Sequence, residues 1–166
     1  MSLKIYLAGF DVFRPDAIAH GERLKALCAQ AGHRGMYPLD ATLPQGLSGL
    51  AAARWIYESN CTIIRQADAV LANLNNFRGG EPDSGTAFEV GYAAALGKPV
   101  VGYLGDARPL REQLGTARDD QGFEVEDFGL ARNLMLACGA TLVRGDAAAG
   151  LARLWEILLA PTPSAA

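Results

Sequence analysis

The feature that most constrains the fold of this chain is a repeated alternation of short β-rich segments with longer segments of helix-forming residues. Strands are expected at residues 4–8, 34–38, 68–74, 99–105 and 140–145, and helices at 16–31, 50–66, 84–96, 146–159 and from 133 onward. Because helices separate successive strands, the strands should run parallel. The pattern predicts an α/β fold: a doubly wound, flavodoxin/Rossmann-like, five-stranded parallel sheet with helices on both faces.

Length and composition narrow the classes of protein that fit. The 166 residues, half of them hydrophobic, suit one domain over residues 1–160, followed by a Pro- and Ala-rich tail at 161–166 that we expect to be disordered. The formal charge is −3 and no run of Lys or Arg occurs, which argues against nucleic-acid polymers as partners. No apolar segment is long enough to span a membrane.

Cysteine usage bears on the compartment and on metal binding. Cys28, Cys61 and Cys138 are odd in number and widely spaced, so neither a disulfide framework nor a CxxC site is indicated. His20 and His33 have no carboxylate or thiol at metal-ligand spacing. We therefore expect a cytoplasmic protein without a metal or cofactor.

Polar loops follow the first three predicted strands at residues 9–16, 39–46 and 75–83. Since the carboxyl ends of parallel strands meet at one edge of a sheet, these loops should converge on a ligand site. The charged stretch at 106–129 is expected to form a lid or a subunit contact.

Glu89 is the most informative single residue, because it lies about two turns into a helix otherwise made of small and apolar residues. Burying its carboxylate without a partner would be costly. The helix pattern leaves two interpretations open: Glu89 is a catalytic nucleophile, or it forms a structural ion pair with Arg78 or Lys98.

Several segments in a fixed order carry a resemblance to a known family. They are KIYLAG with DVFRPD, the YPLD turn, ADAVLANLNNFRGGEPDSGTAFEVGYAAALGKPVV and VEDFGLARNLML. Across most of its length the chain resembles the nucleoside 2'-deoxyribosyltransferase family. The resemblance implies transfer of 2'-deoxyribose between nucleobases, with retention at C1' and Glu89 as the covalent nucleophile. Deoxynucleosides and free nucleobases are the implied partners.

The same resemblance assigns roles to further residues. Tyr6 matches a tyrosine that orients the nucleophile, although it can equally be a core aromatic. Asp83 matches the residue that binds the sugar 5'-hydroxyl, a role that competes with capping the helix. Asn133 matches a residue donated to a neighbouring subunit's site, which implies a homo-oligomer. Phe13 can stack on the base and Asp40 can accept hydrogen bonds from its edge, or both can simply shape loops.

Asn60 departs from the best-known branch of the family, where an aspartate helps to protonate the departing base. An amide cannot act as a general acid, although it can bind the base edge. The proton source is then water, Asp40 or the base itself, and a purely structural Asn60 is the alternative.

Three other functions stay open at this point. The first is an N-glycosidase that hydrolyses deoxynucleosides or deoxynucleoside 5'-monophosphates, and Asp83 disfavours the monophosphates because a carboxylate repels a phosphate. The second is a nucleotide-activating phosphoribohydrolase, against which Asp83 and Ser84 stand where glycines would admit a phosphate. The third is a catalytically inactive nucleotide-binding module, against which the joint presence of Tyr6, Asp83, Glu89 and Asn133 argues.

Overall fold

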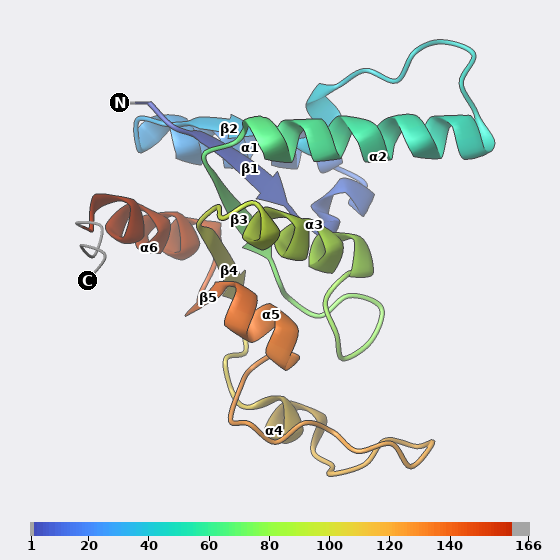
Figure 1. Ribbon diagram of the computed structural model, residues 1–166, viewed down its shortest axis with the longest axis vertical. Coiled ribbons are helices and arrows are strands. Elements are labelled where there is room, and N and C mark those ends of the chain that lie inside the picture. Colours follow the sequence, from blue (N-terminus) through green and yellow to red (C-terminus); the bar gives the residue numbers. More distant parts are fainter. Residues whose placement is uncertain (1, 161–166) are drawn as a thin grey trace.

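The computed structural model describes residues 2–160 of the chain and contains one five-stranded sheet (Figure 1). All of its strand pairs are parallel and the strand order is β2-β1-β3-β4-β5. The strands are β1 (Lys4–Ala8), β2 (Arg34–Met36), β3 (Ala69–Asn73), β4 (Val100–Leu104) and β5 (Thr141–Arg144). The predicted α/β fold with a five-stranded parallel sheet is confirmed.

Helices cover both faces of the sheet, as the pattern predicted. They are α1 (Ala17–Gln30), α2 (Gly49–Gln66), α3 (Ser84–Ala95), α4 (Leu110–Leu114), α5 (Leu134–Gly139) and α6 (Ala147–Leu159), with 3-10 helices η1 (Phe10–Phe13) and η2 (Pro38–Asp40). Ile5 and Leu7 of β1 pack with α1 and α6 in one buried cluster. Tyr6 and Ala8 point to the other face and pack with α2, α3 and α5. The strand period of two therefore divides the core into two layers.

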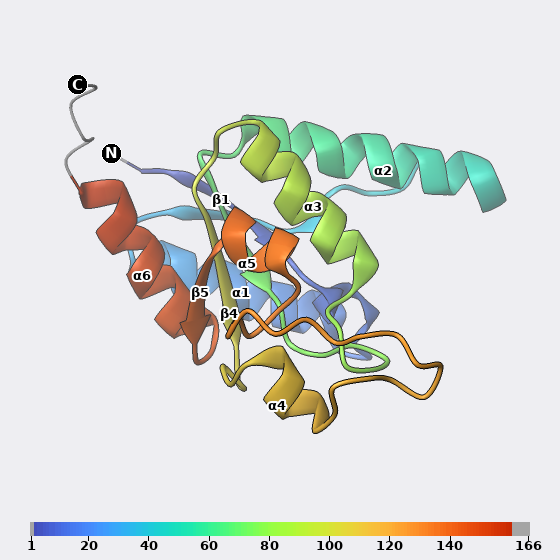
Figure 2. The same ribbon diagram turned by 60° about the horizontal axis from the view of Figure 1, so that its bottom comes forward.

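The element boundaries differ from the prediction mainly where prolines and caps intervene. Strand β2 ends at Met36 instead of Pro38 because Pro38 begins η2, where the backbone N–H of Tyr37 donates to Asp40. The charged stretch expected as a lid or subunit contact contains the short helix α4, and the chain after it extends as an arm away from the sheet (Figure 2). The tail predicted to be disordered, 161–166, lies outside the described residues.

The strand order reverses between the neighbouring strands β1 and β3, because β1 is followed by β2 on one side of the sheet and β3 is followed by β4 on the other. In open α/β sheets, ligands bind beyond the carboxyl ends of the strands at this switch point. The loops after β1 and β3 lead there, and they contain Phe13 and Asp83. Within residues 2–160, no helix combines the length and apolarity needed to cross a bilayer.

Gly21 tests the packing of α1 against the loop after β2. A Cβ at this position would lie 2.4 Å from the Tyr37 ring, so Gly21→Ala should lower the free energy of unfolding by about 1–3 kcal/mol through overpacking. Gly91→Ala is the matched control, because nothing lies within 4 Å of its Cβ position and alanine favours helix by about 0.5–1 kcal/mol. Urea denaturation should show opposite signs for the two variants, and equal stability of both would contradict this packing.

Candidate active site

A largely apolar pocket of about 380 Å³ lies at the carboxyl end of β1, between the loops after β1 and β2, helix α2 and the start of α3. Its lining comprises Gly9, Val12, Phe13, Pro38, Leu39, Ala41, Leu43, Trp55, Ile56, Ser59, Asn60, Asp83, Gly85, Thr86 and Glu89. The few polar groups belong to α2 and α3. Apolar walls with a few placed polar groups are typical of small-molecule sites.

Glu89, on the pocket wall, makes a short polar contact with Tyr6, which is buried and does not line the pocket. The Tyr6 hydroxyl donates to Glu89 Oε1 at 2.5 Å, and Tyr6 is itself fully buried. Tyr6 meets Glu89 because its side chain points to the sheet face that α3 covers. The structure therefore brings together the two residues expected to form the nucleophile and its orienting partner.

The protonation of this pair follows from its burial. Desolvation raises the pKa of Glu89 to about 7, helped by the charge of Asp83, while hydrogen bonds from Tyr6 and Asn60 act in the lowering direction. Burial, followed by the negative charge of Glu89, raises the pKa of Tyr6 far above its ordinary range. Tyr6 thus stays protonated and remains a hydrogen-bond donor. A carboxylate with weak hydration and one strong donor is suited to nucleophilic attack.

Neither of the ion pairs considered for Glu89 is present. The Lys98 ammonium donates to the carbonyl oxygens of Arg65 and Ala67. The Arg78 guanidinium lies over aromatic rings, with its Cζ 4.6 Å from the Phe77 centroid and 5.3 Å from the Phe13 centroid. The structural ion-pair interpretation of Glu89 is therefore not supported.

Asp83 caps α3 and also lines the pocket. Its Oδ2 accepts from the backbone N–H of Thr86 at 2.9 Å and from the Thr86 hydroxyl at 3.1 Å. Both cap bonds use the same oxygen, and Oδ1 accepts no hydrogen bond from the described residues. The two roles foreseen for Asp83, cap and ligand, are compatible because they can use different oxygens.

Asn60 lies beside Glu89 on the neighbouring helix α2. Its Nδ2 is 3.4 Å from Glu89 Oε1, a long hydrogen bond, and its buried Oδ1 has no partner among the described residues. An unmet buried acceptor is costly unless a ligand satisfies it. This amide is therefore available to a donor group on a bound molecule.

Phe13 forms part of the pocket wall, and the ring of Phe77 stacks on it. Phe77 stacks on Phe13 at a centroid distance of 5.4 Å and on Phe10 at 4.8 Å. Phe13 keeps 58% of its surface exposed, so ring surface remains for a ligand. This position agrees with a stacking role.

Three predicted site residues do not line the pocket: Tyr6, which reaches Glu89 by its hydrogen bond, and Asp40 and Asn133, which do not. The Asp40 oxygens accept from Lys25 Nζ at 2.7 Å and from the Tyr37 backbone N–H at 2.9 Å, so Asp40 shapes the η2 turn. Asn133 Nδ2 donates to Glu126 at 2.6 Å, and its Oδ1 caps α5. The structure does not bring either side chain to Glu89.

The sequence interpretation missed most of the pocket wall that α2 supplies. Trp55, Ile56 and Ser59 line the pocket together with Asn60. Residues four apart lie on one helical face, so Asn60 as a site residue places Ile56 beside it, and Ser59 likewise places Trp55. The helical period was thus the signal that could have identified them.

Comparison with known proteins identifies a family and a fold for this chain. The profile of the nucleoside 2-deoxyribosyltransferase family matches residues 5–135. A 2-desoxiribosyltransferase from Leishmania mexicana superposes with a TM-score of 0.79 at 39% identity, covering 93% of this chain and 98% of that one. A 2-deoxyribosyltransferase from Bacillus psychrosaccharolyticus, at 19% identity and a TM-score of 0.59, shares the fold over 96% of this chain and 93% of that one.

Two relatives in other organisms are similar over part of their length. An uncharacterized Schizosaccharomyces pombe protein is 36% identical over 117 residues, which are 69% of this chain and 56% of that protein. The 5-hydroxymethyl-dUMP N-hydrolase of Mus musculus is 33% identical over 92 residues, 54% of this chain and 50% of the enzyme. The chain therefore spans about half the length of these two relatives. The match over residues 5–135 includes Tyr6, Asn60, Asp83 and Glu89, and shows that the chain belongs to the nucleoside 2-deoxyribosyltransferase family.

Proposed function

We propose that this protein transfers 2'-deoxyribose between nucleobases through a covalent intermediate on Glu89. The observation that carries the proposal is the 2.5 Å contact between the buried Tyr6 hydroxyl and Glu89, which lines a largely apolar pocket. A carboxylate that is poorly hydrated and oriented by one donor is chemically matched to an electron-poor sugar carbon.

In the first step, a Glu89 oxygen forms a bond to C1' of the bound deoxynucleoside as the C1'–N bond breaks. The base leaves with the electron pair of that bond and takes up a proton. In the second step, a nitrogen of another base attacks C1', the ester bond to Glu89 breaks, and the attacking base loses a proton. Two inversions give net retention and ping-pong kinetics.

The leaving base receives its proton from the solvent, either at the departing nitrogen or at another ring nitrogen before the bond breaks. Among the described residues that line the pocket, the carboxyl groups are those of Asp83 and Glu89. Asp83 is committed to the helix cap and the sugar, and Asn60 can bind the base edge without supplying a proton. Asp40, foreseen as a possible source, is held in its ion pair with Lys25.

Hydrolysis is the second candidate, and the similarity to a 5-hydroxymethyl-dUMP N-hydrolase favours it. Water and a free base would attack the same C1' carbon of the same intermediate. The two activities differ in the acceptor and, for monophosphates, at the 5' end of the sugar, the part of the substrate that the proposal assigns to Asp83.

We retain a cross-subunit role of Asn133 as part of the proposal. Asn133 caps α5, which follows the projecting arm in the chain (Figure 2), its amide Nδ2 donates to Glu126, and it does not line the pocket. In a homo-oligomer, Asn133 would complete the active site of a neighbouring copy of the chain.

Exchange tests the reaction class. The protein is incubated with 2'-deoxyadenosine or thymidine, with and without a second free base, and products are separated chromatographically. We expect a new deoxynucleoside that forms only when the acceptor base is present. Glu89→Ala should retain the wild-type unfolding curve and lose activity by at least about a thousandfold. Release of free base at a rate independent of the acceptor, without exchange, would support the hydrolase instead.

The pH dependence tests the environment of Glu89. Because the nucleophile must be ionised and its pKa is raised to about 7, kcat/KM should increase with pH through about 7. The Tyr6 hydrogen bond acts to lower this pKa, so Tyr6→Phe should move the acid limb to higher pH. Tyr92→Phe is the control, because Tyr92 lies on α3 with Glu89 but its hydroxyl accepts from Arg65, and this variant should leave the acid limb unchanged. An acid limb at the ordinary pKa of a glutamate would refute the desolvated site.

Selectivity at the 5' end tests Asp83. Asp83→Asn keeps a capping oxygen for Thr86 but removes the charge that a 5'-phosphate would meet. We expect kcat/KM for the deoxynucleoside to decrease, and its ratio to that for the 5'-monophosphate to fall by at least about tenfold. A ratio equal to that of the wild type would show that Asp83 does not meet the 5' end.

A further inference from the structure

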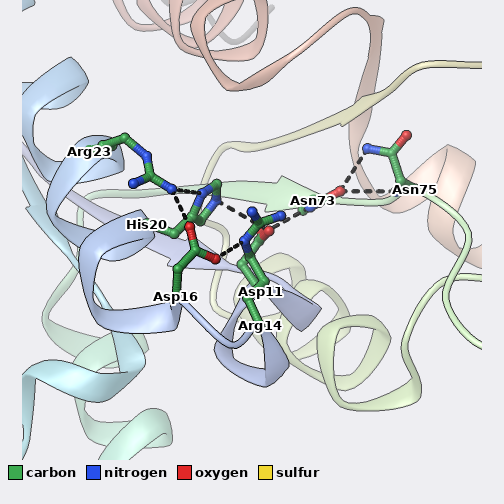
Figure 3. Close-up of polar contacts among 7 residues, drawn as sticks. All are labelled: Asp11, Arg14, Asp16, His20, Arg23, Asn73 and Asn75. Atoms are coloured by element: carbon green, nitrogen blue, oxygen red, sulfur yellow. Dashed lines mark hydrogen bonds and ion pairs between the residues drawn. The ribbon is translucent and has the colours of Figure 1, made fainter.

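A polar network lies along the carboxyl ends of the central strands (Figure 3). None of its residues lines the pocket, but Asp11 stands in the chain between the pocket residues Gly9 and Val12. The centre of the network is Asp11, which is 4% exposed and lies on η1. Asn73 Nδ2, at the end of β3, donates to Asp11 Oδ2 at 2.8 Å, and this hydrogen bond is buried. A buried carboxylate this close to a ligand pocket requires an explanation, because its desolvation is costly.

The orientation of the Asn73 amide is fixed by Asn75. The Asn75 backbone N–H, which can only donate, points to Asn73 Oδ1 at 3.2 Å, and Asn75 Nδ2 donates to the same oxygen at 2.7 Å. Asn75 Oδ1 in turn accepts from the Gly105 backbone N–H at 2.8 Å. With its oxygen occupied, the Asn73 amide can present only N–H groups to Asp11. A directed chain of bonds thus runs from the end of β4 to η1.

Close packing makes this contact stiff. A Cβ on Gly9 would lie 2.8 Å from Asp11 Oδ2 and 2.9 Å from Asn73 Cβ, so the backbone approaches both side chains without a gap. Gly9 itself lines the pocket, and so do Val12 and Phe13, the two residues that follow Asp11 in η1. A shift of the Asp11 carboxylate must therefore shift this wall.

The outer part of the network, formed by His20, Asp16 and the two arginines, stabilises the position of Asp11 less than the Asn73 hydrogen bond does. His20 Nε2 lies 3.2 Å from Asp11 Oδ1 but is not aimed at it as a hydrogen bond. Asp16 pairs with Arg14 at 2.8 Å and with Arg23 at 2.7 Å, near the surface. Exposed pairs of this kind stabilise by about 1 kcal/mol or less, so the buried Asn73–Asp11 bond dominates.

We infer that Asp11 is a positioning residue that acts through η1 to hold the Gly9–Phe13 wall against the bound nucleoside. The network lies on the α1 side of the sheet, because Asn73 alternates with Ala72 and Leu74, which face α2 and α3. Tyr6 and Glu89 lie on that opposite face. Asp11 should consequently govern substrate affinity and leave the chemical step unchanged. This inference rests on the proposed function.

The experiment exchanges the two polar groups. Asn73→Asp places two carboxylates at a buried hydrogen-bond distance and should displace η1. The double variant Asp11→Asn with Asn73→Asp restores one donor facing one acceptor, while the new carboxylate still accepts from Asn75. We expect KM for 2'-deoxyadenosine to increase at least about tenfold in the single variant with kcat within about threefold of wild type, and KM to recover in the double variant. Arg23→Ala, at the exposed end, is the control and should behave as wild type.

Binding is also measured without turnover. Trp55 lines the pocket and the other tryptophan, Trp155, packs on His33, so a Trp155→Phe, Glu89→Ala background reports occupancy by Trp55 fluorescence. The affinity for 2'-deoxyadenosine should be weakened by Asn73→Asp and restored in the double variant Asp11→Asn with Asn73→Asp. Because this readout needs no catalysis, a failure of the proposed transfer reaction is distinguishable from a failure of the inference.

Three results would overturn the inference: unchanged affinity in Asn73→Asp, a loss confined to kcat, or no recovery in the double variant. If Asn73→Asp does not fold, Asp11→Ala and Asp11→Asn replace it. Asp11→Asn keeps an acceptor for Asn73 and should bind about as wild type, whereas Asp11→Ala should bind at least about tenfold more weakly. Equal affinities of these two variants would contradict a positioning role.

Discussion

The arrangement of this protein depends on shielding the Glu89 carboxylate from most of the solvent while one hydroxyl group holds it in place. Burial raises its pKa to about 7, and the Tyr6 hydroxyl at 2.5 Å limits that increase. Without its donors the pKa of this carboxyl group would be higher and less of it would be ionised, whereas a fully hydrated carboxylate would be a weaker nucleophile. The contact joins the middle of β1 to the second turn of α3, so it exists only when the sheet and the helix layer are both formed.

The two faces of the sheet carry different groups of residues around this contact. On the α2 and α3 face lie Tyr6, Glu89, Asn60 and the part of the pocket wall that α2 supplies. On the α1 face lies the Asp11 network, which connects the ends of β4 and β3 to η1. Because both groups of residues follow from the alternation of side chains along β1 and β3, one strand pair supports both the reacting groups and the wall that faces them.

Much of this was accessible from the sequence, for reasons that are local. The β-rich and helical periods located all five strands, and β1 was predicted at its observed bounds because Gly9 ends the apolar run. Glu89 stood out because a charge within a run of small and apolar residues is unusual. Family resemblance connected it to Tyr6, and no local pattern could have done so, since they are 83 residues apart.

Other features could not be predicted because they depend on tertiary partners. Asp40 was a plausible base contact until Lys25, on a different helix, proved to bind its oxygen. Asp11 was unremarkable in a polar loop, and its burial depends on Asn73 from a strand 62 positions later. Trp55 and Ile56 became part of the site through the packing of α2 beside α3.

The central claim is that Glu89 becomes covalently bonded to the sugar, and trapping that intermediate tests it most directly. The protein is mixed with a deoxynucleoside in the absence of an acceptor base, quenched with acid and digested for mass spectrometry. The account predicts that the peptide containing Glu89 gains the mass of one deoxyribosyl group and that Glu89→Ala gains none. Turnover of the deoxynucleoside without an adduct, or with the adduct on another residue, would contradict it.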